Sequence, residues 1–113
     1  MLPALRRKYT CLCCGWPCLD VPPYKNWLSL PVHPGLKPPY EQHFGMASYE
    51  VCLCCGFEFG HDDDFGGETF QESLEKWIAR GAPWFWEKEK PEGWSLERQL
   101  KDAGIVRLGK TGL

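Results

Sequence analysis

Two short stretches of this chain share a cysteine pattern that suits metal binding. Each reads Cys-Leu-Cys-Cys-Gly, once at residues 11–15 and again at residues 52–56. The outer cysteines of each copy can direct both sulfurs at one ion, and the glycine accepts positive φ without a steric penalty. Two such turns, facing each other, place four thiolates in a tetrahedron that suits Zn²⁺ at about 2.3 Å per bond. The expected ligands are Cys11, Cys14, Cys52 and Cys55.

The spacing leaves the identity of the metal open. We expect one structural Zn²⁺, but four thiolates in a tetrahedron also suit iron. Residues 9–16 resemble the first knuckle of a rubredoxin and residues 52–56 resemble its second knuckle. That resemblance implies iron and one-electron transfer as the alternative. Rubredoxins are compact, whereas residues 15–51 separate the two cysteine pairs here and a helical pattern follows them.

Three cysteines and three histidines stand outside the expected ligand set. Cys13 and Cys54 occupy equivalent positions inside the two repeats, so we expect free thiols that point away from the ion. Cys18 is expected to be a small buried hydrophobe, as free cysteines usually are. A dithiol redox role for these three thiols stays open. A surface or capping role is expected for His33, His43 and His61.

The pattern of reactive residues predicts no enzymatic activity. The sequence shows no nucleophile with a base and an orienting residue, no phosphate-binding loop and no pair of catalytic carboxylates. A closed four-thiolate site also keeps no open coordination position for a water molecule. The acidic run Asp62–Asp64 lacks the spaced pattern of a calcium loop, so we expect an exposed acidic turn there.

Composition narrows the class of protein and its compartment. The 113 residues carry a formal net charge of −2. A nucleic-acid-binding zinc ribbon is a further alternative to the zinc and iron interpretations, and this charge disfavours it. The seven cysteines form an odd number, unlike most secreted disulfide scaffolds. No apolar signal region and no apolar stretch long enough to cross a membrane is evident. We therefore expect a cytoplasmic protein.

The elements that must position the cysteines suggest one α+β domain over residues 1–113. The first knuckle falls in residues 9–20, a proline-rich excursion in 21–45, the second knuckle in 46–60 and a helical part in 68–104. We expect a small zinc ribbon whose knuckles sit on short β-hairpins, with one or two packed C-terminal helices. Strands are expected over Met46–Val51 and Phe57–Phe59, and the excursion should be extended because proline fixes φ. The excursion is expected to pack on the core through Trp27, Leu28 and Leu30.

Local signals predict the two helices. Thr69 and Glu72 form a capping-box pattern, and Gly81 can end a helix, which predicts a helix over 69–80. Ser95 is a second N-cap candidate and precedes a shorter helix over 95–103. The first helix has one apolar stripe, made of Phe70, Leu74, Trp77 and Ile78. Between the helices, some of the aromatic residues 84–86 should fill the core and the rest should form an exposed patch.

Residues 9–16 and 48–102 together resemble a known family, the small bacterial cysteine-rich "CPCC" proteins. The resemblance is carried by Tyr9, Cys11, Cys13, Cys14, Gly15 and Trp16, by Ser48–Cys52 with Cys55, and by Trp77–Gly81, Trp84, Phe85, Pro91, Trp94, Gln99 and Leu100. It implies a zinc-ribbon-like domain without assigned enzymatic activity, and some relatives stand in toxin–immunity gene neighbourhoods. We therefore expect a protein–protein interaction module, with a toxin among the candidate partners. The candidate surfaces are the acidic residues 62–64 and the aromatic residues 84–86.

Overall fold

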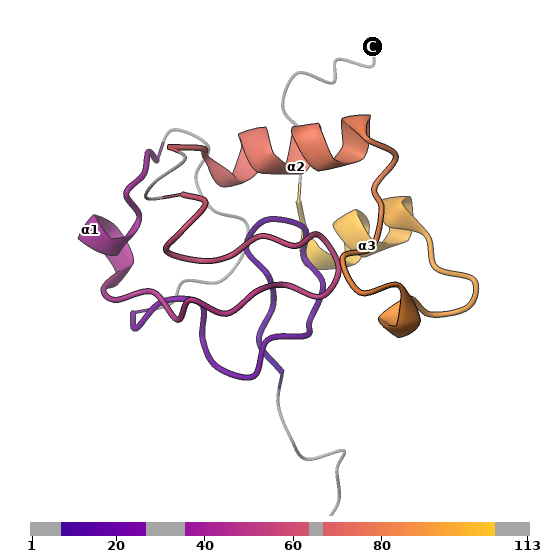
Figure 1. Ribbon diagram of the computed structural model, residues 1–113, viewed down its shortest axis with the longest axis horizontal. Coiled ribbons are helices and arrows are strands. Elements are labelled where there is room, and N and C mark those ends of the chain that lie inside the picture. Colours follow the sequence, from indigo (N-terminus) through magenta and orange to yellow (C-terminus); the bar gives the residue numbers. More distant parts are fainter. Residues whose placement is uncertain (1–7, 27–35, 64–66, 106–113) are drawn as a thin grey trace, which may run out of the picture.

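The computed structural model describes residues 8–26, 36–63 and 67–105, and it consists of short helices joined by long loops (Figure 1). The expected contacts of Trp27, Leu28 and Leu30 lie outside these residues. The elements are α1 (Glu41–Phe44), α2 (Phe70–Ala79), a 3-10 helix η2 (Glu87–Glu89) and α3 (Leu96–Ala103). Figure 1 shows α2 along one side of the molecule, with α1 and α3 at opposite ends of the loop region. None of the helices described is both long and apolar enough to cross a membrane.

The expected β-hairpins are not confirmed, because the residues described by the structure contain no β-strand. Each knuckle is flanked by a single antiparallel bridge instead. Tyr9 pairs with Leu19 around the first knuckle, and Val51 pairs with Glu58 around the second. The described part is therefore a fold of helices and loops rather than the α+β ribbon that the sequence suggests.

Backbone conformation explains why the bridges do not lengthen into strands. Tyr49 adopts φ of 62° and Gly60 adopts φ of 98°, and neither value belongs to an extended strand. These two residues end the pairing on either side of the second knuckle, so the strands expected over 46–51 and 57–59 do not form. Beside the first knuckle, Pro17 has no N–H to donate to a ladder.

Helix α2 forms where its caps predict it. The N–H of Glu72 donates to Oγ1 of Thr69 at 3.0 Å, and the N–H of Thr69 donates to Oε1 of Glu72 at 3.0 Å. At the other end Gly81 has φ of 96°, and the N–H of Ala82 donates to the carbonyl of Trp77 at 2.9 Å. Both ends therefore agree with the helix predicted over 69–80. The buried side chains of α2 are Phe70, Leu74 and Trp77.

Helix α3 is also confirmed close to its predicted range of 95–103. Oγ of Ser95 accepts a hydrogen bond from the N–H of Arg98 at 3.2 Å. Gly104 follows the helix with φ of 74°, and the N–H of Ile105 returns to the carbonyl of Leu100 at 2.9 Å. Leu100 is buried, so α3 presents one side to the knuckles.

Aromatic side chains form the core on one side of the knuckles. The rings of Tyr40 and Phe70 stack with their centroids 4.0 Å apart, which joins the segment before α1 to the start of α2. Helix α1 itself is a single turn inside the proline-rich excursion, where the sequence predicts mostly extended chain. This stacking packs the described end of the excursion against the core. The cluster comprises Tyr24, Tyr40, Phe44, Phe57, Phe59 and Phe70.

One residue of the acidic run is a buried structural group, which corrects the expectation of an exposed acidic turn. Asp63 has no exposed surface. One of its carboxylate oxygens accepts from the hydroxyl of Tyr24, and the other accepts from the N–H of Gly60 at 2.7 Å. Asp62 accepts from the N–H of Glu58 at 2.8 Å. Asp64 lies outside the described residues.

Candidate metal centre

The two knuckles, residues 11–15 and 52–56, repeat each other in structure as well as in sequence. In each, the glycine N–H donates to the carbonyl of the first cysteine at 2.9 Å. The N–H of that cysteine in turn donates to the carbonyl of the aromatic residue after the glycine at 3.0 Å. The turn requires positive φ, which is 89° at Gly15 and 83° at Gly56. The glycines are therefore part of the site, because they let both sulfurs of a knuckle face the same way.

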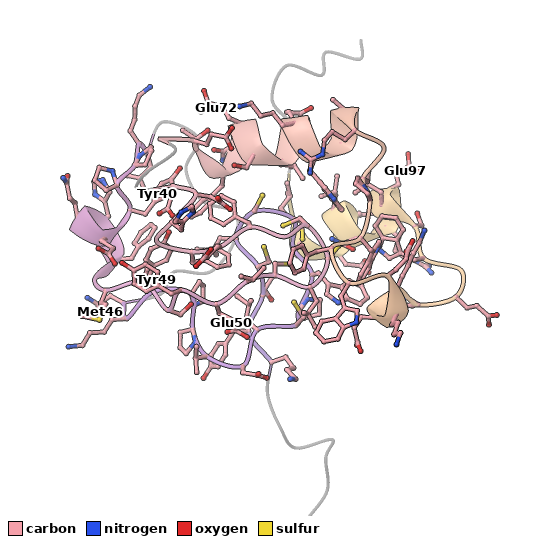
Figure 2. All side chains as sticks on the ribbon, in the orientation of Figure 1. Tyr40, Met46, Tyr49, Glu50, Glu72 and Glu97 are labelled. Atoms are coloured by element: carbon pink, nitrogen blue, oxygen red, sulfur yellow. The ribbon has the colours of Figure 1, made fainter. Side chains whose placement is uncertain are left out.

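The knuckles bring together the four cysteines that the spacing selects. All four Sγ atoms lie within 4.8 Å of one another, and Figure 2 shows sulfur atoms gathered between the central loops. The Sγ atoms of Cys11 and Cys55 are 3.8 Å apart, and those of Cys14 and Cys52 are 3.7 Å apart. Sulfurs about 2.3 Å from a central ion in a regular tetrahedron are separated by about 3.8 Å. The four cysteines could therefore hold one four-coordinate metal ion.

Backbone amides support negative charge on the first sulfur of each knuckle. The N–H groups of Cys13 and Cys14 point at Sγ of Cys11, at 3.4 and 3.5 Å. In the second knuckle, the N–H of Cys54 points at Sγ of Cys52 at 3.4 Å. Amide hydrogen bonds to a thiolate favour its charged form and fix its direction toward an ion.

The electrostatics of the four sulfurs favour a bound cation. Burial raises the pKa of Cys11, Cys14 and Cys55 well above the ordinary value. Hydrogen bonds from Cys11 and the other neighbouring thiols lower the pKa of Cys52 well below it. One thiolate is thus stable among three thiols, whereas four buried thiolates need a positive ion between them. Metal binding must therefore displace protons from this site.

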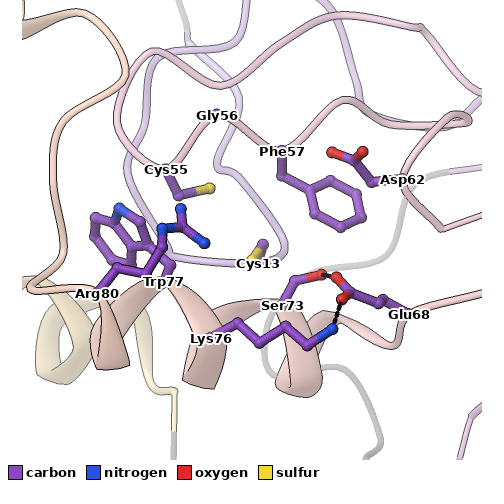
Figure 3. Close-up of a pocket in the computed structure, with 10 residues that line it drawn as sticks. All are labelled: Cys13, Cys55, Gly56, Phe57, Asp62, Glu68, Ser73, Lys76, Trp77 and Arg80. Atoms are coloured by element: carbon purple, nitrogen blue, oxygen red, sulfur yellow. Dashed lines mark hydrogen bonds and ion pairs between the residues drawn. The ribbon is translucent and has the colours of Figure 1, made fainter. Parts of the chain in front are cut away.

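One of the four proposed ligand residues is partly exposed. Cys11, Cys14 and Cys52 have no exposed surface, whereas Cys55 is half-buried. Cys55 lines a cavity of about 220 Å³ that lies between the second knuckle and α2 (Figure 3). Figure 3 shows the guanidinium of Arg80, from the end of α2, reaching toward the sulfur of Cys55. Among the four proposed ligands, Cys55 is therefore the least buried residue, and it lies beside a positive charge.

The opposite end of this cavity holds the carboxylate of Glu68. Glu68 accepts a hydrogen bond from the hydroxyl of Ser73 at 2.6 Å and also forms an ion pair with Lys76. The hydrogen bond to Lys76 is the main reason that the pKa of Glu68 is lowered. Lys76 is paired with Glu68, and Figure 3 shows Arg80 closer than Lys76 to the sulfur of Cys55.

The middle cysteine of each knuckle contacts a helix. The thiol of Cys13 donates to the carbonyl of Phe70 at 3.6 Å, where α2 begins. The thiol of Cys54 donates to Oε1 of Gln99 in α3 at 3.8 Å. A hydrogen bond with Cys55 lowers the pKa of Cys13, but burial and nearby charges outweigh it and raise that pKa to about 11. Cys13 is therefore a protonated structural thiol at neutral pH.

Gln99 is a residue of the site that sequence reasoning missed. Its Nε2 donates to the carbonyl of Cys14 at 2.9 Å and to Sγ of Cys54 at 3.6 Å. Its Oε1 accepts from the indole N–H of Trp94 at 2.6 Å. Gln99 thus connects both knuckles to α3. The available signal was its position three residues after Leu96, on the inward side of the helix.

Cys18 differs from its expected role as a buried hydrophobe. It is partly exposed, and its Sγ lies 3.7 Å from Sγ of Cys52. The bridge between Tyr9 and Leu19 brings this part of the chain back to the knuckles. A fifth sulfur therefore touches the four-cysteine site.

The histidines stay away from the sulfurs as far as the described chain shows. His43 and His61 are exposed, and Nδ1 of His61 lies 3.4 Å from a carboxylate oxygen of Asp62. His33 lies outside the described residues. The described histidines therefore have the surface positions that the sequence predicts.

Comparison with known proteins found no match for this chain. No family model matches the chain, and neither a curated protein nor a solved structure matches it.

Proposed function

We propose that this protein is a non-enzymatic metal-binding module with one structural Zn²⁺ held by its four clustered cysteines. The observation that carries the proposal is the mutual contact of four sulfurs, at separations that match a thiolate tetrahedron. When bound, the ion supplies a cross-link between two knuckles that are separated by residues 15–51. The free energy of metal binding then becomes free energy of folding.

A structural role follows from the donor set. Four cysteine sulfurs fill all four positions of a tetrahedral zinc ion, so that no position is left for water or substrate. Three of these sulfurs are fully buried. The middle cysteines, Cys13 and Cys54, join the same knuckles to α2 and α3. The site therefore stands at the junction of the parts that it holds together.

An iron electron carrier is the second candidate, and the amide hydrogen bonds to sulfur are compatible with it. Such bonds stabilise iron–thiolate centres and set their potential, as they do for other metal thiolates. The decisive measurement is the metal content and visible spectrum of reduced protein purified without added metal. About one zinc ion per chain in a colourless sample supports the structural zinc module. A red sample with iron supports the electron carrier, and a reduced protein without any metal contradicts both.

We also propose that the aromatic segment after α2 binds a protein partner. Trp84 is buried against Trp16 and Trp94, but the next two side chains are exposed, Phe85 by 62% and Trp86 by 51%. Their N–H groups donate to the carbonyls of the second knuckle, each at 2.9 Å. Two large aromatic side chains are thus displayed in a fixed position beside the metal centre, as is common at interfaces.

The resemblance to CPCC-type proteins places a toxin among the partners to test. The candidate surface is narrower than the sequence suggests, because the buried carboxylate of Asp63 cannot contact a partner directly. The net charge of −2 makes nucleic acid a poorer candidate, which a salt-dependent gel-shift assay tests.

Partner capture from the source cells tests the aromatic surface. We expect a double Phe85→Ser/Trp86→Ser variant to lose a partner that the wild type retains, with metal content unchanged. The matched control is Met46→Ser, because Met46 is 72% exposed and lies near α1 at the other end of the molecule (Figures 1 and 2). Equal capture by the double variant and the wild type contradicts the assignment of this surface.

A further inference from the structure

Cys18 places a fifth sulfur in contact with one ligand of the four-cysteine site. Its Sγ lies 3.7 Å from Sγ of Cys52, the same separation that joins Cys52 to Cys14. This is the sulfur–sulfur distance expected along an edge of a thiolate tetrahedron, about 3.8 Å. Cys13 and Cys54 also contact ligand sulfurs, those of Cys55 and Cys14, but their thiols donate to α2 and α3 as well. The thiol of Cys18 is hydrogen-bonded to Cys52.

The chain around Cys18 is held in this position by contacts on both sides. Tyr9 and Leu19 exchange two backbone hydrogen bonds of 2.8 and 3.0 Å, directly after Cys18. The N–H groups of Asp20 and Val21 then donate to the carboxylate of Glu50 at 2.8 and 3.3 Å. Since residue 50 leads into the second knuckle, these contacts fix Cys18 beside the first ligand of that knuckle.

We propose that Cys18 is an exchange ligand, which takes the place of Cys52 on the metal ion. The inference rests on the metal site proposed above and deepens it. As the bond from Cys18 to the metal forms and the bond from Cys52 breaks, the proton of the Cys18 thiol passes to Cys52 along their hydrogen bond. The ion keeps four thiolates, and the exchange needs no external acid, base or oxidant.

This arrangement gives the centre two sets of four ligands. Cys52 has no exposed surface, while Cys18 is partly exposed, so the exchange moves one ligand position toward solvent. Loss of Cys52 from the ion then leaves no vacant position for a competing ligand. The site should retain its metal better than a site with four sulfurs alone.

Cobalt(II) spectra of serine variants test the proposal, because thiolate-to-cobalt charge-transfer absorption grows with the number of coordinating sulfurs. We expect Cys52→Ser to keep the four-thiolate spectrum of the wild type and the double variant Cys18→Ser/Cys52→Ser to show three thiolates. The matched control is Cys11→Ser, which removes a ligand whose side-chain hydrogen bonds are with the other three proposed ligands. It should show three thiolates by itself.

A Cys52→Ser spectrum equal to that of Cys11→Ser overturns the exchange ligand and leaves the metal site intact. Absence of cobalt or zinc binding by the wild type overturns the metal site itself, so the two failures are distinguishable. We also expect the double variant to bind zinc about 10-fold or more weakly than Cys52→Ser in competition with a chelator.

A kinetic measurement keeps the test valid if Cys52→Ser does not fold. The single variant Cys18→Ser retains all four proposed ligands, and it should lose zinc to an excess of chelator about 10-fold faster than the wild type. Cys13→Ser is the control, because its thiol is bonded to the carbonyl of Phe70. An unchanged rate in Cys18→Ser overturns the proposal.

Discussion

Gly15 shows how one residue controls the approach of the first knuckle to α3. Its φ is 89°, and a Cβ placed there lies 2.6 Å from Cβ of Ala103, closer than real Cβ contacts. We expect Gly15→Ala to lower the free energy of unfolding by about 1 kcal/mol for conformation and by about 1–3 kcal/mol more for overpacking. Chemical denaturation of the metal-loaded protein measures this change.

The matched control for this substitution is Gly81→Ala. Gly81 has a similar φ of 96°, but no atom lies within 4 Å of its added Cβ. It should show only the conformational part of the effect. Equal destabilisation by the two substitutions would mean that the contact between the first knuckle and α3 is unimportant.

The number of protons that leave the site on metal binding is a second prediction at this scale. Burial raises the pKa of three ligands, Cys11, Cys14 and Cys55, so they hold their protons at neutral pH in the metal-free protein. Hydrogen bonds from Cys11 and the other neighbouring thiols lower the pKa of Cys52. We expect proton release from at least the three ligands with a raised pKa, and zinc affinity that falls as pH falls. Calorimetry in buffers of different ionisation enthalpy measures the number, and affinity independent of pH contradicts the ligand set.

In reduced, metal-free protein, the partly exposed residue Cys55 should react with reagents according to their charge. Figure 3 shows Arg80 reaching toward this sulfur, and a positive charge attracts an anionic reagent. We expect Arg80→Gln to slow alkylation of Cys55 by iodoacetate about two- to fivefold while leaving the rate with neutral iodoacetamide nearly unchanged. Mass spectrometry identifies the modified cysteine.

Lys76→Gln serves as the control for Arg80, because Lys76 lines the same cavity but is paired with Glu68. Its effect on the iodoacetate rate should be smaller. The same loss for both variants, or for both reagents, would show that the guanidinium does not act on this sulfur.

The ligand residues could be identified from spacing because both cysteines of each pair lie on one turn. Cys18 and Gln99 could not, because their contacts with the site depend on how distant segments pack. The bridge from Tyr9 to Leu19 and the inward face of α3 create these contacts, and neither leaves a short-range pattern in the sequence.

At the level of elements, α3 is attached to the site through a buried polar side chain. Gln99 bonds the carbonyl of Cys14 and the indole of Trp94. We expect Gln99→Leu to lower the free energy of unfolding by about 1–3 kcal/mol, because the carbonyl and the indole lose their partner. Arg98→Ala, on the exposed side of the same helix, should change it by no more than about 0.5 kcal/mol. Similar values for the two variants contradict the role of Gln99.

Local signals explain which elements could be predicted. The helices over 70–79 and 96–103 depend on caps that lie within a few residues of their ends, and the sequence states those caps directly. The hairpins failed because Tyr49 takes positive φ, which nothing in its side chain requires. That conformation places its ring over Gly60, where an added Cβ would lie 2.7 Å from a ring carbon, so it is set by tertiary packing.

At the scale of the whole molecule, the described chain has little regular structure to hold the knuckles together. Its bridges are isolated, and an aromatic cluster and a tryptophan cluster lie on either side of the cysteines. The sequence predicts the joining of two distant knuckles because the pattern repeats. It does not predict how loops replace the sheet, because that depends on packing between segments far apart in the chain.

Thermal unfolding with and without metal tests the central claim, that an ion at the four cysteines holds this fold together. We expect reduced protein treated with a chelator to lose its cooperative transition or to unfold at a much lower temperature, because it loses the free energy of metal binding. Addition of about one equivalent of zinc should restore the transition. Cooperative unfolding at the same temperature with and without metal would contradict the claim.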